Sequence, residues 1–144
     1  MCGIAGIFIH NHQEAQNLAF NPKNAISMMA DSLRHRGPEK VSTWSSENKK
    51  CWLGHARLRV TDNSEQADQP FTTKSGKTTL VFNGEIYNSG DIVNACMQWL
   101  KNYSRTKSDT EVLAEAIEML NEDVFYNIEG MFAFGAYNEE KQEL

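Results

Sequence analysis

The 144-residue sequence is poor in cysteine, in positive charge and in long apolar runs. Its three cysteines, Cys2, Cys51 and Cys96, are odd in number and widely spaced, so they predict neither a disulfide framework nor a CxxC metal site. The longest apolar run near the start, residues 4–9, is far too short to cross a bilayer, and no basic segment precedes it. We therefore expect a cytoplasmic protein that has no membrane partner.

Positive charge is scarce as well, since 14 Lys and Arg stand against 19 Asp and Glu, for a net charge of −5. Nucleic-acid backbones are bound by clustered Lys and Arg, so no nucleic-acid partner is expected. His10 and His12 lack a third ligand at useful spacing, and no metal site is predicted. With 40% hydrophobic residues and a length suited to one domain, the chain should fold as one globular unit.

The hydrophobic pattern predicts strands over residues 4–10, 41–45, 51–60, 78–82 and 131–137, the last as a central strand. Asn21 followed by Pro22 predicts the start of a helix, and the core side of that helix would hold Ile26, Met29, Ala30 and Leu33. Groups of strands between pairs of helices favour an α+β fold with mostly antiparallel sheets.

Two further helices are predicted in the second half of the chain. Ser89 can begin a helix whose apolar side holds Ile92, Cys96, Trp99, Leu100 and Tyr103. Ser108 and Glu111 have the spacing of a capping box, which predicts a second helix with Val112, Leu113, Ala116, Ile117 and Leu120 inside.

Cys2 follows the initiator methionine and precedes Gly3. Removal of Met1 would give Cys2 a free α-amine beside its thiol, so that one residue supplies a nucleophile and a base. The reference pKa of such an amine is about 7.7–8.0, which leaves roughly a tenth of it neutral at pH 7. The alternative is that Cys2 is a small buried apolar residue at the start of a strand, and position alone leaves both interpretations open.

Asn83, Gly84 and Glu85 follow a predicted strand and are interpreted as a tight turn. Such a turn can direct an amide side chain and a backbone N–H at one point, as an oxyanion hole requires. An ordinary Asn-Gly hairpin turn is the alternative.

Arg57 and Asp109 are candidates for holding the charged groups of a substrate. A guanidinium on a strand can bind a small carboxylate through two hydrogen bonds, although an arginine there is usually solvated. Asp109 lies in the first turn of a predicted helix, where a carboxylate either interacts with the helix dipole or binds a substrate ammonium. Together the two residues can bind an α-amino acid and leave its side chain beside Cys2.

Seven motifs in order carry a family resemblance: MCGIAGIF at 1–8, HRGPE at 35–39, GHARL at 54–58, QP at 69–70, NGEIYN at 83–88, SDTE at 108–111 and GMFAF at 130–134. They resemble the class II, N-terminal-nucleophile glutaminase domain of glutamine-hydrolysing asparagine synthetases. The resemblance covers nearly the whole chain. It implies an Ntn-hydrolase-like α-β-β-α sandwich of two mostly antiparallel sheets.

The resemblance also implies roles for individual residues. Cys2 matches the nucleophile that attacks the side-chain amide of glutamine, giving a thioester and ammonia. Asn83 and Gly84 match the oxyanion donors. The substrate-binding positions are matched by Arg57 for the carboxylate, Val60 for a backbone contact, and Glu85 and Asp109 for the α-amine.

Two departures from the family pattern shape the expectations for partners and cofactors. The family domain continues with further strands beyond the segment matching 131–137, so residues 1–144 are expected to be a glutaminase domain that is incomplete at its C-terminus. The resulting sheet edge would need a partner or a homodimer to cover it. The synthetase half is missing, so ATP and magnesium are expected only there, and this domain should need no cofactor.

Three functions remain open at this stage. The first is glutamine hydrolysis that supplies ammonia to a synthetase domain or subunit. The second is a non-catalytic glutamine-binding or interaction module, suggested by the missing strands and by Met1. The third is an amidotransferase subunit that serves a different acceptor.

Overall fold

The computed structural model describes residues 2–10, 18–60, 62–96 and 104–144, and its strands form two antiparallel sheets. The first sheet has the order β1-β3-β2, from β1 (Gly3–Phe8), β3 (Cys51–Arg57) and β2 (Lys40–Ser45). The second has the order β4-β5-β6, from β4 (Phe71–Thr72), β5 (Thr78–Ile86) and β6 (Gly130–Asn138). The α+β class and the antiparallel pairing predicted from the sequence are confirmed.

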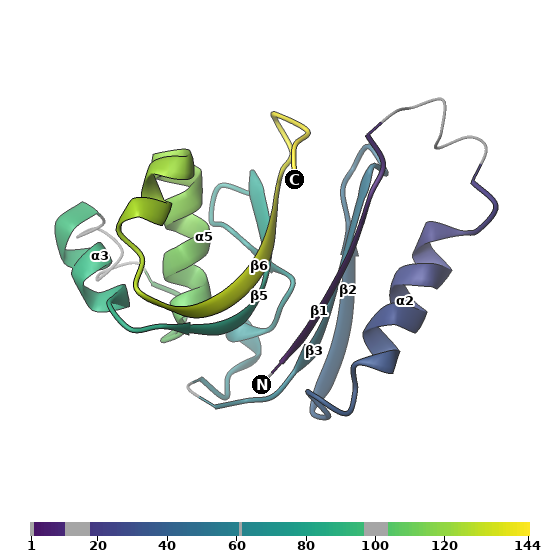
Figure 1. The fold of residues 1–144 in the computed structure, drawn as a ribbon, viewed down its shortest axis with the longest axis horizontal. Helices are drawn as coiled ribbons and strands as arrows, with labels where there is room; N and C mark the ends of the chain where they lie inside the picture. Colours follow the sequence, from purple (N-terminus) through teal and green to yellow (C-terminus); the bar gives the residue numbers. More distant parts are fainter. Residues whose placement is uncertain (1, 11–17, 61, 97–103) are drawn as a thin grey trace.

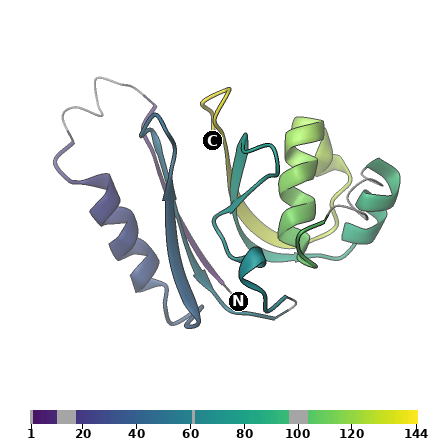
Figure 2. The same ribbon diagram turned by 180° about the vertical axis from the view of Figure 1, so that it is seen from behind.

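The helices lie on the outer faces of the two sheets, as both ribbon views show (Figure 1, Figure 2). Helix α2 (Pro22–Ser32) covers the first sheet, while α3 (Ser89–Cys96) and α5 (Asp109–Leu120) lie beside the second. Short 3₁₀ turns occupy Glu65–Ala67 and Asn121–Tyr126. In the described part of the chain, none of the helices has the length and apolar character needed to cross a membrane.

Helix α2 begins as its sequence predicts, because the Asn21 side chain accepts a hydrogen bond from the Asn24 N–H and Pro22 opens the first turn. Its buried residues are Ile26 and Ala30, which pack on β3 where Gly54 leaves room. Met29 was predicted to face the core, and this is wrong: it is 39% exposed, since the helix rests on the sheet along a narrower stripe.

The two sheets contact each other through Leu53 of β3, Val81 of β5 and Tyr137 of β6, which share one buried cluster. The Tyr137 ring lies 6.0 Å from the Trp44 ring, and its hydroxyl oxygen accepts a hydrogen bond of 3.0 Å from the Asn48 amide. A separate cluster joins the second sheet to α5, with Leu80, Phe82 and Leu113 at its centre. Each sheet is therefore packed on both sides.

Strand β5 differs from the prediction because it continues through Asn83 and Gly84 to Ile86. The predicted tight turn at Asn83-Gly84 is therefore wrong. Asn83 pairs with Ala133 and Gly84 with Phe132, so the long partner strand β6 carries the ladder past this dipeptide. An added Cβ at Gly84 would lie 2.3 Å from the Met131 carbonyl oxygen, which explains why glycine occupies this position.

Two other predictions from the sequence differ from the structure, and a third is not tested by it. Strand β3 ends at Arg57 rather than at residue 60. Strand β6 was predicted to be central, but among the described strands it pairs with β5 alone and lies at the edge of its sheet. The predicted continuation of the helix at Ser89 over Trp99, Leu100 and Tyr103 falls outside the described residues.

Helix α5 is capped by the Ser108 side chain, which accepts a hydrogen bond from the Thr110 N–H. The second half of the predicted capping box is wrong, because the Glu111 carboxylate turns away from Ser108. It accepts hydrogen bonds from the backbone N–H groups of Arg105 and Thr106 and so shapes the loop that leads into the helix.

Candidate active site

Cys2 lies directly before β1 and is half-buried against the residue that follows β3. Its Sγ accepts a hydrogen bond from the Leu58 N–H at 3.4 Å and lies 3.6 Å from the Leu58 carbonyl oxygen. The Arg36 Nε donates to the Cys2 carbonyl oxygen at 2.9 Å. The backbone of this short segment is thus fixed on two sides, and the sulfur is held one residue from Arg57.

Arg57 is almost fully buried, and its guanidinium is already bound by the chain itself. It donates to the Ser64 carbonyl oxygen at 2.8 Å and also to the Asp68 carboxylate and the Asp62 carbonyl oxygen. Lys40 pairs with the same Asp68 carboxylate. In this structure Arg57 therefore organises the loop of residues 62–68. A ligand could bind only to those N–H groups of the guanidinium that these acceptors leave unused.

Burial alone would raise the pKa of Asp68. Hydrogen bonds from Lys40 and Arg57 outweigh that effect and hold the pKa of the carboxyl below its ordinary value. The ion pair under Arg57 therefore stays charged at neutral pH.

Asn83 carries an unpaired polar atom on β5. Its Oδ1 is buried and has no hydrogen-bond partner among the residues that the structure describes. A half-turn of the amide about its last torsion exchanges this oxygen for the NH₂ group, so the same buried position can present a donor. An unpaired buried polar group costs free energy unless a ligand or water binds it.

Asp109 and Glu85 form an acidic pair beside the end of β5. The Asp109 Oδ2 accepts a hydrogen bond of 3.0 Å from the Ile86 N–H, which joins the start of α5 to the residue after Glu85. Burial raises the pKa of Asp109, and the nearby charge of Glu85 acts in the same direction. Such a pair suits an ammonium group, because a cation relieves the repulsion between the two carboxylates.

Val60 lies three residues beyond the end of β3, and its side chain is 78% exposed. The structure therefore brings the predicted site residues together in two groups. Cys2 lies with Arg57, and the segment Asn83-Gly84-Glu85 lies with Asp109. Val60 makes no side-chain contribution to either group.

Two buried residues near these groups were assigned no role from the sequence. His55 of β3 is 1% exposed, and burial lowers its pKa to about 4. Both ring nitrogens of His55 are buried without a hydrogen-bond partner among the described residues. The charge of Arg57 lowers the pKa of His55 further, and that of Asp68 opposes the shift. The position of His55 in the GHARL motif was the sequence feature that could have drawn attention to it.

Gln69 belongs to the QP motif, but the sequence assigned it no role. Its Oε1 accepts a hydrogen bond of 2.5 Å from the Phe82 N–H, and its Nε2 donates to the Thr110 hydroxyl at 3.2 Å. The buried amide thus fixes β5 next to Asn83 and α5 next to Asp109.

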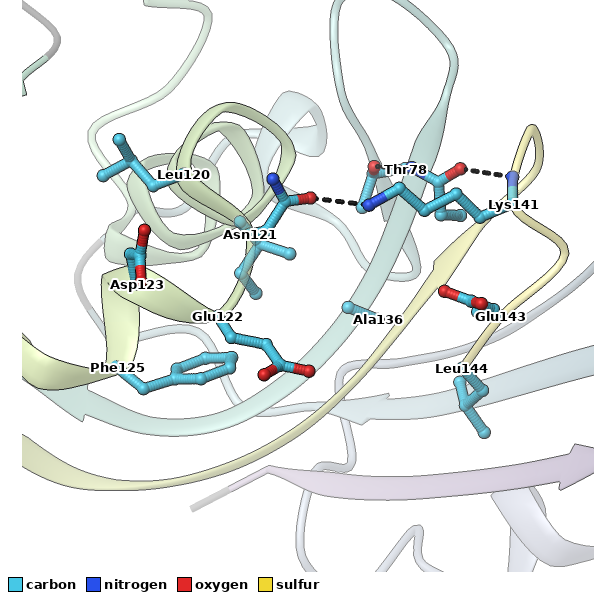
Figure 3. A pocket seen from close by; sticks show the side chains of 12 residues that line it. Thr78, Leu120, Asn121, Glu122, Asp123, Phe125, Ala136, Lys141, Glu143 and Leu144 are labelled. Carbon is cyan, nitrogen blue, oxygen red and sulfur yellow. Dashed lines mark hydrogen bonds between the residues drawn. The ribbon is translucent and has the colours of Figure 1, made fainter.

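Two cavities accompany these residues. One of about 380 Å³ lies between the end of α5 and the C-terminal segment, where Lys141 reaches Asn121 (Figure 3), and none of the predicted site residues lines it. The other, of about 480 Å³, lies between residues 62–66 and 104–107, beside the loop that Arg57 organises.

The described residues contain no cluster of three or more His, Cys, Asp or Glu suited to a metal ion.

Comparison with known proteins shows the family to which this chain belongs. The model of the glutamine amidotransferase domain family matches residues 1–144, so the chain belongs to the class II glutamine amidotransferase domain family. It is 34% identical over its full length to asparagine synthetase [glutamine-hydrolyzing] 3 of Bacillus subtilis and 30% identical to amidase chry2 of Gibberella zeae. It is also 34% identical, over 93% of its length, to an asparagine synthetase of Arabidopsis thaliana. The chain spans only 21–22% of the length of these relatives.

Proposed function

We propose that this chain hydrolyses the side-chain amide of glutamine through a thioester on Cys2. The observation that carries the proposal is the Cys2 sulfur held against Leu58, beside Arg57, in a chain that matches the glutamine amidotransferase domain over its whole length. Removal of Met1 would free the α-amine of Cys2 to act as the base for its own thiol.

In the proposed reaction the thiolate attacks the amide carbon, and the carbonyl oxygen becomes an oxyanion. The Asn83 amide and the Gly84 N–H would stabilise that oxyanion, and each such donor typically contributes about 2.7–4 kcal/mol to the transition state. The C–N bond then breaks, and the protonated α-amine returns its proton to the leaving nitrogen, which departs as ammonia. Water hydrolyses the thioester to glutamate and restores the thiol.

Arg57, Glu85 and Asp109 would bind the α-carboxylate and α-ammonium of the substrate, with a backbone contact near Val60. An arginine and a pair of carboxylates on neighbouring layers match the opposite charges of an α-amino acid. The unpaired Asn83 amide supports placing the reacting amide beside β5.

The two sheets with helices on their outer faces support an Ntn-hydrolase-like α-β-β-α sandwich. We further propose that the ammonia passes to a synthetase domain or subunit of the kind that the relatives' names describe. ATP and magnesium would act in that synthetase part, since the proposed hydrolysis uses only a thiol, an amine and amide groups of this chain.

Ammonia release from glutamine tests the proposal directly. A chain from which Met1 has been removed, as verified by mass spectrometry, should release ammonia. Cys2→Ala should lower kcat by about 10³-fold or more, because the nucleophile is lost. Cys51→Ala is the matched control: Cys51 is fully buried and burial raises its pKa to about 12, so this thiol should not contribute. Full activity of Cys2→Ala would contradict the proposed nucleophile.

A second candidate is a glutamine-binding module without turnover, which the buried and unpartnered Asn83 amide oxygen favours, because this group can bind a ligand whether or not Cys2 has a free α-amine. Calorimetric titration separates the two functions, because such a module would bind glutamine with the same affinity before and after Met1 removal and would release no ammonia.

A further inference from the structure

Asp62 joins two loops that lead to different parts of the proposed substrate site. Its Oδ2 accepts a hydrogen bond of 2.8 Å from the Lys107 N–H, in the loop that precedes Asp109. Its Oδ1 accepts one of 2.7 Å from the Ser64 N–H, and its backbone carbonyl oxygen accepts one from the Arg57 guanidinium. Asp62 thus contacts Arg57 directly, and it is hydrogen-bonded to Lys107, which precedes Asp109 by two residues.

The surroundings of Asp62 make this hydrogen bond important for the spacing of the two loops. The cavity of about 480 Å³ lies along their junction and is lined by Asn63, Ser64 and Gln66 on one side and by residues 104–107 on the other. Side-chain packing is therefore sparse where the loops meet. Backbone hydrogen bonds from Lys107 and Ser64 also lower the pKa of Asp62 to about 2, so the carboxylate is charged at every pH of interest.

We propose that Asp62 is a positioning residue that sets the separation between Arg57 and Asp109, and thereby the affinity of the site for the α-carboxylate and α-ammonium of its substrate. This inference rests on the proposed function, because it concerns the binding of glutamine. Asp62 itself would touch neither the substrate nor the reacting atoms.

The reason is geometric. Arg57 ends a strand of the first sheet, whereas Asp109 begins a helix beside the second sheet, so no single element fixes their distance. A substrate that bridges them is bound well only when that distance matches its two charged groups, and displacements of about 1 Å are enough to cost large factors. The charge-assisted bond from Asp62 to Lys107 joins the two loops directly, while the bond from Gln69 to Thr110 holds the start of α5.

Two variants of Asp62 test the proposal through steady-state glutamine hydrolysis. Asp62→Asn places an NH₂ group against one of the two backbone N–H groups. Asp62→Ser can keep the local turn with Ser64 but is too short to reach Lys107. Both should raise KM for glutamine by about 10-fold or more while kcat stays within about 2-fold, since the reacting amide lies at the other end of the substrate.

A substrate analogue separates positioning from general damage. Glutaramate lacks the α-amine, so it cannot bind Asp109, and the rise in KM caused by either variant should be several-fold smaller for it than for glutamine. Lys107→Ala is the matched control, because it removes a side chain that lines the same cavity but keeps the backbone N–H that donates a hydrogen bond to Asp62. Its KM should equal that of the unaltered chain.

The outcomes distinguish this inference from the proposed function. Equal KM rises for glutamine and glutaramate, an unchanged KM in both Asp62 variants, or the same rise in Lys107→Ala would overturn the role of Asp62. If the unaltered chain releases no ammonia, hydrolysis is wrong, and calorimetric glutamine binding then decides: about 10-fold weaker binding in both Asp62 variants supports positioning, and equal binding refutes it. An unaltered chain that neither hydrolyses nor binds glutamine refutes both.

Discussion

At the scale of single residues, Gly84 is a position where the two long strands come too close for any side chain. An added Cβ would meet the Met131 carbonyl oxygen at 2.3 Å and the Phe132 Cα at 2.5 Å. Gly84→Ala should therefore push β5 from β6 and lower the free energy of unfolding by about 2–3 kcal/mol in urea titrations. Gly90→Ala is the control, since nothing lies within 4 Å of its added Cβ and stability should hold or rise.

Arg57 is the second residue whose substitution should be informative, because its fork satisfies three acceptors of the following loop. Arg57→Lys keeps the charge near Asp68 but cannot serve all three, so we expect a loss of about 1–3 kcal/mol of stability together with weaker glutamine binding. Arg59→Lys should change stability by less than about 0.5 kcal/mol, since Arg59 lies 3.8 Å from Asp68 and is partly exposed. Thermal unfolding and calorimetric titration of both variants measure the difference, and equal behaviour would contradict the role given to Arg57.

At the scale of elements, the short strand β4 is completed by a side chain. β4 begins at Phe71, and Pro70 before it lacks an N–H. The pairing of β4 with β5 does not reach Phe82. The Phe82 N–H instead donates a hydrogen bond to the Gln69 side-chain amide. Gln69→Ala should leave that buried N–H unpaired and cost about 1–3 kcal/mol in chemical unfolding. Gln66→Ala, at an exposed position nearby, should leave the unfolding curve unchanged.

The elements that the sequence predicts well are those determined by neighbouring residues. Asn21 and Ser108 cap their helices through bonds to the next few N–H groups, so their local patterns were sufficient. The length of β5 was not predictable, because its ladder is formed with residues about 50 positions later in the chain. Pairing with Phe132 and Ala133 overrides the turn preference of Asn83-Gly84.

The same reasoning applies to the candidate site. Cys2, Arg57 and Asp109 could be predicted from chemistry and from the resemblance, since each has a side chain suited to a role. Gln69, although part of the QP motif, and Asp62 were assigned no role, because their importance lies in bonds to Thr110 and Lys107, which are 41 and 45 positions away. Only the tertiary structure brings those partners together.

At the scale of the whole molecule, His55 should make stability depend on pH. Its pKa is lowered from 6.5 to about 4 in the folded chain, so the unfolded chain binds the proton more readily between these values. Stability is therefore fully present above about pH 6.5 and is lost as pH falls towards 4, by about 3 kcal/mol in total.

Urea unfolding at pH 7.0 and about pH 4.5, where most of this loss should have occurred, measures the effect in the unaltered chain and in His55→Gln. The variant should show a smaller loss on acidification, and the difference isolates His55. Burial also raises the pKa values of Asp109 and Glu115, but these groups titrate in both chains, so their contributions to the change in stability cancel in the comparison. Equal losses in the two chains would show that His55 does not carry the dependence.

The contact between Tyr137 and Trp44 gives the molecule a built-in optical reporter. One ring belongs to the second sheet and the other to the first, and their centres lie 6.0 Å apart. Light absorbed by the phenol should therefore be emitted by the indole while the layers stay together. Separation of the layers would restore phenol emission, so their association can be followed by fluorescence without any attached dye.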